Sequence, residues 1–199
     1  MNNLRFFIKF FVYSILLFTI CGCQKPQEKK DKFSKLKKQV TDLKNKEIVI
    51  PDSLMIYKKK TDTLQFINLR KNSNFFDTYK IVTYINGDCG SCVMQINSWQ
   101  RVLNMLKYKN ETKFIPIIYT TDINLFKRKM APKIKISHPF YFDFKDEYIT
   151  VNKLYKYNEQ FYTFLLNDNN QVILVGNPAY SPKLMKLYKE EINKRIRKQ

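Results

Sequence analysis

The chain has 199 residues, of which 36 are lysine or arginine and 17 are aspartate or glutamate, so its formal net charge is +19. With four glycines and one histidine, the sequence excludes a glycine-rich phosphate-binding loop and gives no support to Ser–His–Asp catalysis. No internal repeat and no glycine- or serine-rich linker divides the chain, so we expect one folded domain of about 150 residues.

The first 22 residues have the pattern of an export signal. Basic residues precede an apolar stretch, residues 10–20, that is shorter than a membrane-spanning helix. The stretch runs into the letters ICGC at residues 20–23, which resemble the bacterial lipoprotein box. That resemblance implies cleavage after Gly22 and a lipid on Cys23. The alternatives are an ordinary signal peptide and an uncleaved anchor.

Export decides which cysteines remain as thiols. Cys21 leaves with the signal and Cys23 carries the lipid, so the mature chain keeps Cys89 and Cys92 in C-x-x-C spacing. We expect the domain to lie outside the cytoplasm, in the periplasm, held by its lipid to a membrane of a bacterial cell envelope. Disulfides form and persist in such a compartment, and nucleic acid is not an expected partner there.

The mature chain remains strongly basic. Loss of Arg5 and Lys9 with the signal lowers the net charge to about +17. This charge either draws the protein to anionic lipid headgroups or acidic partners, or merely solvates a lysine-rich surface. Composition alone does not choose between these interpretations.

Residues 23–46 follow the signal as a polar, lysine-rich tether. Within it Phe33, Leu36, Val40 and Leu43 recur at helical spacing, which predicts a narrow amphipathic helix. The pattern does not decide whether this helix lies on a membrane, packs on the domain or stays disordered. We place the folded domain at residues 47–199.

The first half of the domain predicts three strands and a helix. The strands are residues 47–51, 63–69 and 79–86, the last being rich in β-branched and aromatic residues. An Asn-Gly-Asp turn then leads into a helix over residues 89–107. On this helix Trp99 belongs to an apolar stripe, so we expect it in the core rather than at a cofactor.

The second half continues to alternate between strands and helices. Asp122 is a candidate N-cap, and Ser181 followed by Pro182 is a good start for the last helix. The alternation predicts an α/β fold with a mixed sheet, closed by a hairpin and a helix. The expected strands are residues 113–120, 138–144, 161–166 and 171–176, and the expected helices are residues 122–130, 147–156 and 182 onward.

The order of these elements around Cys89-Gly90-Ser91-Cys92 resembles the thioredoxin superfamily. The resemblance is nearest to its extracytoplasmic, lipid-anchored TlpA/ResA-like (redoxin-like) group, and it covers about residues 47–196. It implies a thioredoxin-like fold, with a mixed central sheet flanked by helices. It also implies that Cys89 is the exposed nucleophile and Cys92 the resolving thiol of a redox disulfide, without a bound cofactor.

Three positions depart from the pattern of this superfamily. Phe161 stands where a cis-proline usually faces the cysteines, and Thr83 stands where thioredoxins often carry a buried carboxylate. Asp88, in place of a frequent aromatic residue, either opposes thiolate formation at Cys89 or caps the helix. Phe161 and Tyr162 are candidates for a face that contacts the substrate.

Thiol–disulfide exchange is the leading functional hypothesis. Its partners would be exported cysteine-containing proteins and an electron donor in the membrane or outside the cytoplasm. The main alternative is a non-catalytic interaction protein in which Cys89 and Cys92 form a static disulfide. A third hypothesis is a Cu(I) or Zn(II) site of Cys89, Cys92 and His138, although a structural zinc site normally needs four ligands.

Overall fold

The computed structural model describes residues 26–67, 78–106 and 112–197, with the side chains given from residue 30 onward. The expected signal, residues 1–22, and the lipidated Cys23 lie outside the described residues. The chain divides into two compact units, Met1–Gln39 and Val40–Gln199. Helix α2 (Pro26–Leu43) occupies most of the tether, so the helical prediction for this segment is confirmed. None of the described helices combines the length and apolar character needed to cross a membrane.

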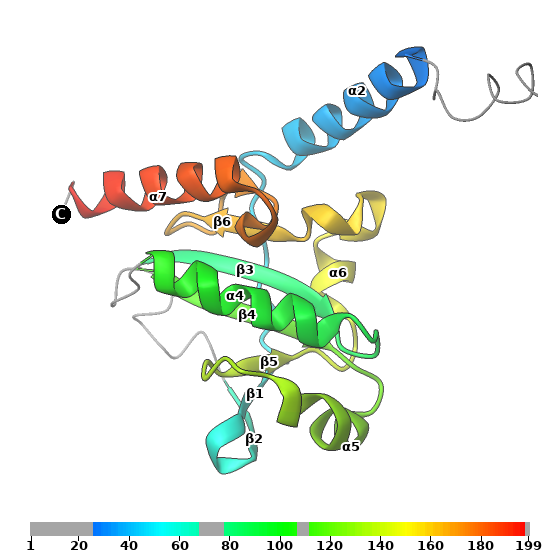
Figure 1. Ribbon diagram of the computed structural model, residues 1–199, viewed down its shortest axis with the longest axis vertical. Coiled ribbons are helices and arrows are strands. Elements are labelled where there is room, and N and C mark those ends of the chain that lie inside the picture. The colour runs from blue at the N-terminus through cyan, green and yellow to red at the C-terminus, as the bar shows by residue number, and fades with distance from the viewer. Residues whose placement is uncertain (1–25, 68–77, 107–111, 198–199) are drawn as a thin grey trace, which may run out of the picture. The chain divides into compact units, whose positions relative to one another are not determined.

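The second unit is built on a mixed sheet (Figure 1). Strands β3, β4 and β5 run parallel to one another. On one side β6 pairs antiparallel with β3 and β7 antiparallel with β6, and on the other side β1 pairs antiparallel with β5 and β2 antiparallel with β1. Among the described residues the order across the sheet is β2-β1-β5-β4-β3-β6-β7. The strands are β1 (Met55–Lys58), β2 (Thr63–Phe66), β3 (Tyr79–Asn86), β4 (Thr112–Tyr119), β5 (Phe140–Phe142), β6 (Thr163–Leu166) and β7 (Val172–Val175).

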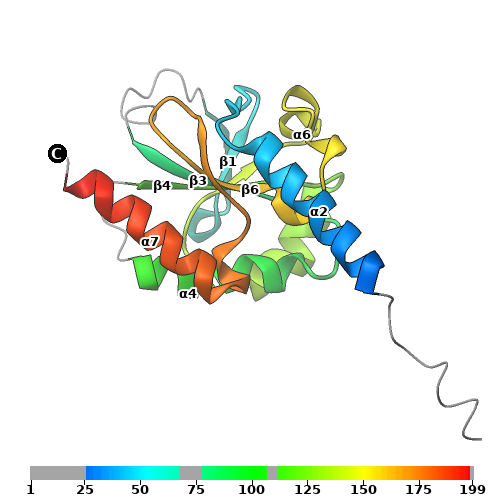
Figure 2. The same cartoon turned by 90° about the horizontal axis from the view of Figure 1, so that it is seen from above.

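Both faces of the sheet are covered, which explains the nearly continuous apolar run of β3. Ile81 and Ile85 of this strand belong to one buried cluster, and Val82 belongs to the other. The first cluster lies under α4 (Cys92–Leu106) and α7 (Pro182–Ile196), and the second under α6 (Glu147–Val151). Figure 2 shows α4 and α7 on one side of the strands and α6 on the other.

The buried face of α4 follows the predicted stripe. Trp99 is fully buried and its ring centroid lies 4.7 Å from that of Phe114 on β4. The prediction that Trp99 is a core residue is therefore confirmed. Both predicted caps are also present, because the Asp122 carboxylate accepts from the Leu125 N–H and the Ser181 hydroxyl accepts from the Leu184 N–H.

Several element predictions were wrong or incomplete; the helix expected at residues 147–156, for example, is the shorter α6 followed by a 3-10 turn, Leu154–Lys156. Residues 47–51 make only a single bridge, between Glu47 and Gln171, and Pro51 has no N–H with which to extend it. Strand β1 was not predicted. The helix expected after Asp122 is a short α-helix, α5 (Ile123–Leu125), followed by a π-helical segment Phe126–Met130 and a 3-10 turn Ala131–Lys133.

Candidate functional site

The C-x-x-C segment lies between the end of β3 and the start of α4. The backbone N–H of Gly87 donates to the Tyr119 carbonyl at 2.7 Å, which ties the turn to the end of β4. A Cβ atom at this position would lie 2.8 Å from that same carbonyl oxygen and from the Ile118 side chain. Only glycine therefore allows the turn to approach β4 so closely.

The two cysteines differ sharply in exposure. Cys89 is exposed, whereas Cys92 is fully buried as the first residue of α4 and packs in the cluster that contains Trp99. The Cys92 N–H donates to the Cys89 carbonyl at 3.0 Å, so the backbone turns directly from one cysteine into the helix of the other. Both are free thiols in this structure. Cys89 is thus accessible to solvent, whereas Cys92 is buried inside the domain.

The side chain of Ser91 hydrogen-bonds to the exposed sulfur of Cys89. Its hydroxyl lies 3.1 Å from the Cys89 Sγ and accepts from the Gln95 Nε2 at 3.3 Å. This side-chain bond is the largest cause of a lowered pKa at Cys89, and the Ser91 backbone N–H adds to it. The negative charge of Glu159 acts in the opposite direction. Hydrogen bonding to the charged form thus favours the thiolate at Cys89.

Cys92 is held as a thiol. Burial is the largest cause of its raised pKa, followed by repulsion from Cys89 and, as the smallest contribution, from Asp88. The Val93 backbone N–H acts in the opposite direction. The site therefore pairs an exposed, more acidic cysteine with a buried, less acidic one, which is the division of roles that the resemblance implied for nucleophile and resolving thiol.

Asp88 joins two loops of the site. Its carboxylate accepts from the Thr120 hydroxyl, from the Thr121 N–H at 3.0 Å and from the Thr121 hydroxyl at 2.7 Å. It accepts no bond from the first turn of α4, so the capping expectation is not met. The carboxylate that raises the pKa of Cys89 is that of Glu159 and not that of Asp88.

The segment before β6 differs from the expected substrate face. Tyr162 is only 7% exposed, and its hydroxyl donates to the Leu154 carbonyl at 2.9 Å. The expectation that its ring lines a binding surface is therefore wrong. Phe161 remains half-buried beside it. The described peptide bonds include no cis bond, so the Gln160–Phe161 bond, which would be the cis bond if residue 161 were that proline, is trans.

Thr83 lies where the resemblance would place a buried carboxylate. Its hydroxyl is 2.8 Å from that of Thr163, its register partner on β6, and both side chains are buried. The two hydroxyl groups satisfy each other. A neutral pair therefore occupies this position, and it offers no carboxylate that could accept a proton from Cys92.

Sequence reasoning missed two residues of the site. Gln95 was within reach, because it lies four residues after Ser91 on the same helix face. Glu159 is far from the cysteines in sequence and reaches them only through the fold.

His138 does not join the cysteines in a metal site. Its ring packs edge-on against Phe114 at 5.7 Å between centroids, and burial lowers its pKa. Within the ranges that the structure describes, no three histidine, cysteine or acidic side chains come together as a possible metal site. The hypothesis of a site formed by Cys89, Cys92 and His138 is thus overturned.

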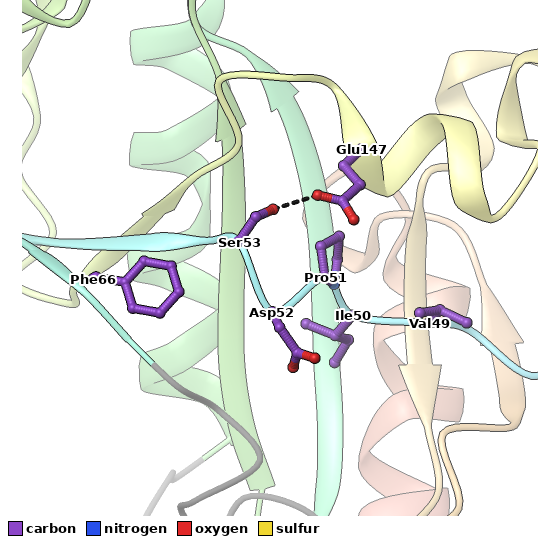
Figure 3. Close-up of a pocket in the computed structure, with 7 residues that line it drawn as sticks. All are labelled: Val49, Ile50, Pro51, Asp52, Ser53, Phe66 and Glu147. Atoms are coloured by element: carbon purple, nitrogen blue, oxygen red, sulfur yellow. Dashed lines mark hydrogen bonds between the residues drawn. The ribbon is translucent and has the colours of Figure 1, made fainter.

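A separate hollow of about 400 Å³ lies beside α6 (Figure 3). The Ser53 hydroxyl donates to Glu147 at one side of it, and the exposed ring of Phe66 borders it. Neither cysteine lines this hollow, so it is not part of the C-x-x-C site. Its lining residues are Val49, Ile50, Pro51, Asp52, Ser53, Phe66 and Glu147.

No family model matches the sequence, and no curated protein matches it either. Solved structures do. One is the thioredoxin domain of a thiol-disulfide oxidoreductase from Bacteroides vulgatus, at 12% identity and a TM-score of 0.51, covering 72% of this chain and 96% of that one. Another is a reduced 2-Cys peroxiredoxin from Plasmodium vivax, at 12% identity and a TM-score of 0.53, covering 78% of this chain and 99% of that one. The likeness is one of fold, and the predicted thioredoxin-like fold is thereby confirmed.

Proposed function

We propose that the protein is a thiol–disulfide oxidoreductase whose Cys89 and Cys92 cycle between dithiol and disulfide. The observation that carries this proposal is the asymmetry of the pair. Cys89 is exposed and hydrogen-bonded through its sulfur to Ser91, whereas Cys92 is buried at the start of α4. A thiolate that partners can reach, backed by a protected second thiol, is what a two-step exchange requires.

The exchange runs in two balanced steps. The Cys89 thiolate attacks one sulfur of a client disulfide, so that a mixed disulfide forms and the other client sulfur leaves as a thiolate. Cys92 then loses its proton to solvent or to the departing sulfur and attacks the Cys89 sulfur. The client leaves reduced by two electrons, and a Cys89–Cys92 disulfide remains. A dithiol donor must return those two electrons, and the same steps in reverse would oxidise a client.

The proposal extends to location and partners. The signal at residues 1–22 and the lipid on Cys23 would anchor the protein to a bacterial envelope membrane, with the domain in the periplasm. Exported proteins with cysteines would be its clients, and its electron donor would lie in the membrane or outside the cytoplasm. Support comes from the order of charge, apolar stretch, small residue and cysteine in the sequence, and no nucleic acid or bound cofactor is invoked.

A redox titration tests the proposal. The protein is equilibrated in graded glutathione buffers, and free thiols are trapped and counted by mass spectrometry at each potential. We expect one two-electron transition of Cys89 and Cys92 between about −270 and −120 mV. A Cys92→Ala protein is the matched control, and we expect it to form a mixed disulfide with glutathione and to show no two-electron transition.

The rival function is an interaction protein with a static disulfide. The trans bond between Gln160 and Phe161, where the thioredoxin resemblance would place a cis-proline, is the observation in its favour. A Cys89–Cys92 disulfide that resists reduction until the domain unfolds would contradict the oxidoreductase proposal and support this rival. Reversible reduction of the folded protein would eliminate it.

A further inference from the structure

Eight basic residues lie on two neighbouring segments of the domain, and we call this set the basic surface. It is contributed by the hairpin between β1 and β2 and by the segment that follows α5. In Figure 1 the hairpin and this segment lie toward the β2 edge of the sheet. The residues are Lys58, Lys59, Lys60, Lys127, Arg128, Lys129, Lys133 and Lys135.

Side-chain contacts hold the hairpin and this segment together. Lys127 forms an ion pair with Asp62 at 3.0 Å, and its ammonium group lies 5.2 Å from the centre of the Tyr57 ring. Lys59 donates to the Ile134 carbonyl. The cations of the hairpin and those of the segment after α5 therefore lie on adjoining parts of the domain, although they are about 70 positions apart in the sequence.

Most of this charge has no counterion among the described residues of the domain. Asp62 is the acidic residue of the hairpin, and Lys127 already pairs with it. The remaining exposed cations make no ion pair with any residue that the structure describes; they are Lys58, Lys60, Arg128, Lys129, Lys133 and Lys135. On α7, by contrast, Lys186 lies 3.9 Å from Glu190 and Lys194 lies 2.7 Å from Glu191.

The composition of the surface suits a layer of headgroups. Five of its six exposed, unpaired cations are lysines, whose ammonium groups are mobile point charges, whereas fixed carboxylate partners favour the planar fork of arginine. Leu125, 43% exposed, stands directly before this segment. An apolar side chain beside flexible cations is characteristic of surfaces that lie on a membrane interface.

We propose that the basic surface binds anionic lipid headgroups and holds the β2 edge of the domain against the membrane. The inference rests on the membrane location in the proposed function and not on the redox chemistry. Attraction between several cations and an anionic leaflet adds up, and it acts over a Debye length of about 8 Å at physiological salt. A lipid anchor together with such a surface gives two membrane attachments, which fix the orientation of the domain as well as its location.

Protection of lysines from acetylation tests the proposal on the full chain. The protein is reconstituted in vesicles of phosphatidylcholine, with or without phosphatidylglycerol, and each lysine is followed by mass spectrometry. On the anionic vesicles we expect several-fold slower acetylation of Lys58, Lys60, Lys129, Lys133 and Lys135. Lysines 183 and 186 of α7 serve as references in the same molecule, and their rates should not change. Salt at about 0.5 M should remove the protection.

A pair of variants sharpens the test, with Lys135 as an unchanged reporter. Replacing Lys58, Lys60, Lys129 and Lys133 with glutamine should abolish the protection of Lys135, whereas replacing Lys183, Lys186, Lys189 and Lys194 should leave it intact. Equal acetylation on both kinds of vesicle would overturn the proposal, as would protection of α7 alone. Protection by polyglutamate but not by anionic vesicles would also overturn it and would indicate an acidic polypeptide as the partner.

The two proposals fail separately. Acetylation does not depend on the cysteines, and the same protection is expected of a Cys89→Ala, Cys92→Ala protein. Conversely, the glutamine variants should keep the redox transition of the parent. Loss of lysine protection with a normal redox transition would therefore reject only the membrane surface.

Discussion

At the scale of single residues, Ser91 has the most direct influence on the reactive sulfur. Gln95 donates to the Ser91 oxygen, which leaves the hydroxyl hydrogen free to point at the Cys89 Sγ. A hydroxyl that is oriented in this way stabilises the thiolate more than the thiol, because the charged acceptor forms the stronger bond. Gln95 thus acts on the sulfur only through Ser91, as a positioning residue.

Replacement of Ser91 by alanine should raise the pKa of Cys89 and slow its alkylation at neutral pH. Gln95→Ala should produce a smaller rise, because the hydroxyl remains but loses its orientation. The pH dependence of iodoacetamide modification in a Cys92→Ala background measures both effects. Ser98→Ala is the matched control, since that hydroxyl donates to the Gln95 carbonyl and does not touch the sulfur. An unchanged midpoint for Ser91→Ala would show that the hydroxyl does not stabilise the thiolate.

Asp88 should contribute to stability in a pH-dependent way. Desolvation, the largest single influence, raises its pKa, but the hydrogen bonds from Thr120 and Thr121 together lower it. A carboxyl with a lowered pKa in the folded state stabilises the protein above its ordinary range near pH 4, and that stability is lost as the pH falls through the folded-state pKa. Asp88→Asn should therefore cost up to about 1 kcal/mol at pH 7, a modest figure because the group is exposed.

Urea unfolding at pH 7 and at pH 3 measures this contribution. The difference between the parent and Asp88→Asn should shrink at the lower pH. Thr121→Val, which removes one hydroxyl donor to the carboxylate, should reproduce part of the same loss. A difference that stays constant across the range would mean that the charge of Asp88 does not stabilise the loop.

The sequence identified the candidate reactive cysteines of the site, but it did not predict the contacts around them. Three signals together identified Cys89 and Cys92: their C-x-x-C spacing at an expected helix start, the export signal that removes the other cysteines, and the thioredoxin resemblance. The partners of Asp88 are Thr120 and Thr121, 32 and 33 positions away, and no local pattern indicates such a contact. Tyr162 was misplaced for a similar reason, because an aromatic residue before a strand does not reveal which face it occupies.

At the scale of elements, the pairing of β3 with β6 contains a buried polar contact. Thr83 and Thr163 satisfy each other in an otherwise apolar layer. Thr83→Val or Thr163→Val alone should lower the free energy of unfolding by about 1–3 kcal/mol, because the remaining hydroxyl is left without a partner. The double variant should recover most of that loss.

Denaturant unfolding of all four proteins completes a double-mutant cycle. Strictly additive losses in the double variant would rule out a mutual hydrogen bond between the two threonines. The midpoint potential of Cys89 and Cys92 is expected to be the same in all four proteins, because neither threonine hydroxyl can act as a proton acceptor in the way that a carboxylate does.

Elements with strong local signals were predictable and those that depend on tertiary context were not. Strand β3 was predicted with its observed bounds because it is rich in β-branched and aromatic residues and runs into a clear Asn-Gly-Asp turn. Residues 47–51 carry a similar apolar run, but Ile48 is used to fill the second core cluster rather than to pair in the sheet. Strand β1 has four residues, and it forms by pairing with β2 and β5, which no local pattern reveals.

At the scale of the whole molecule, the net charge of +19 should set the salt dependence of stability. Repulsion among like charges disfavours the compact state, and added salt screens it. Sodium chloride should therefore raise the melting temperature by several degrees between low salt and about 0.5 M.

Calorimetry across that range measures the effect. A Lys133→Glu, Lys135→Glu protein is the informative control, since both side chains are exposed and neither forms an ion pair with a residue in the described ranges, and the change removes four units of net charge. Its dependence on salt should be weaker than that of the parent. A melting temperature that is independent of salt would show that the excess charge is spread too widely to oppose folding.

Two glycines near the cysteines, Gly87 and Gly90, are under different evolutionary constraints. Gly87 cannot gain a side chain without colliding with the Tyr119 carbonyl, whereas a Cβ on Gly90 would meet no atom within 4 Å. Sequences that diverge from this one can therefore replace Gly90, the residue after Cys89, while they must keep glycine at position 87. Selection for a new client or a new reduction potential has an open position at Gly90, where a change leaves the scaffold intact.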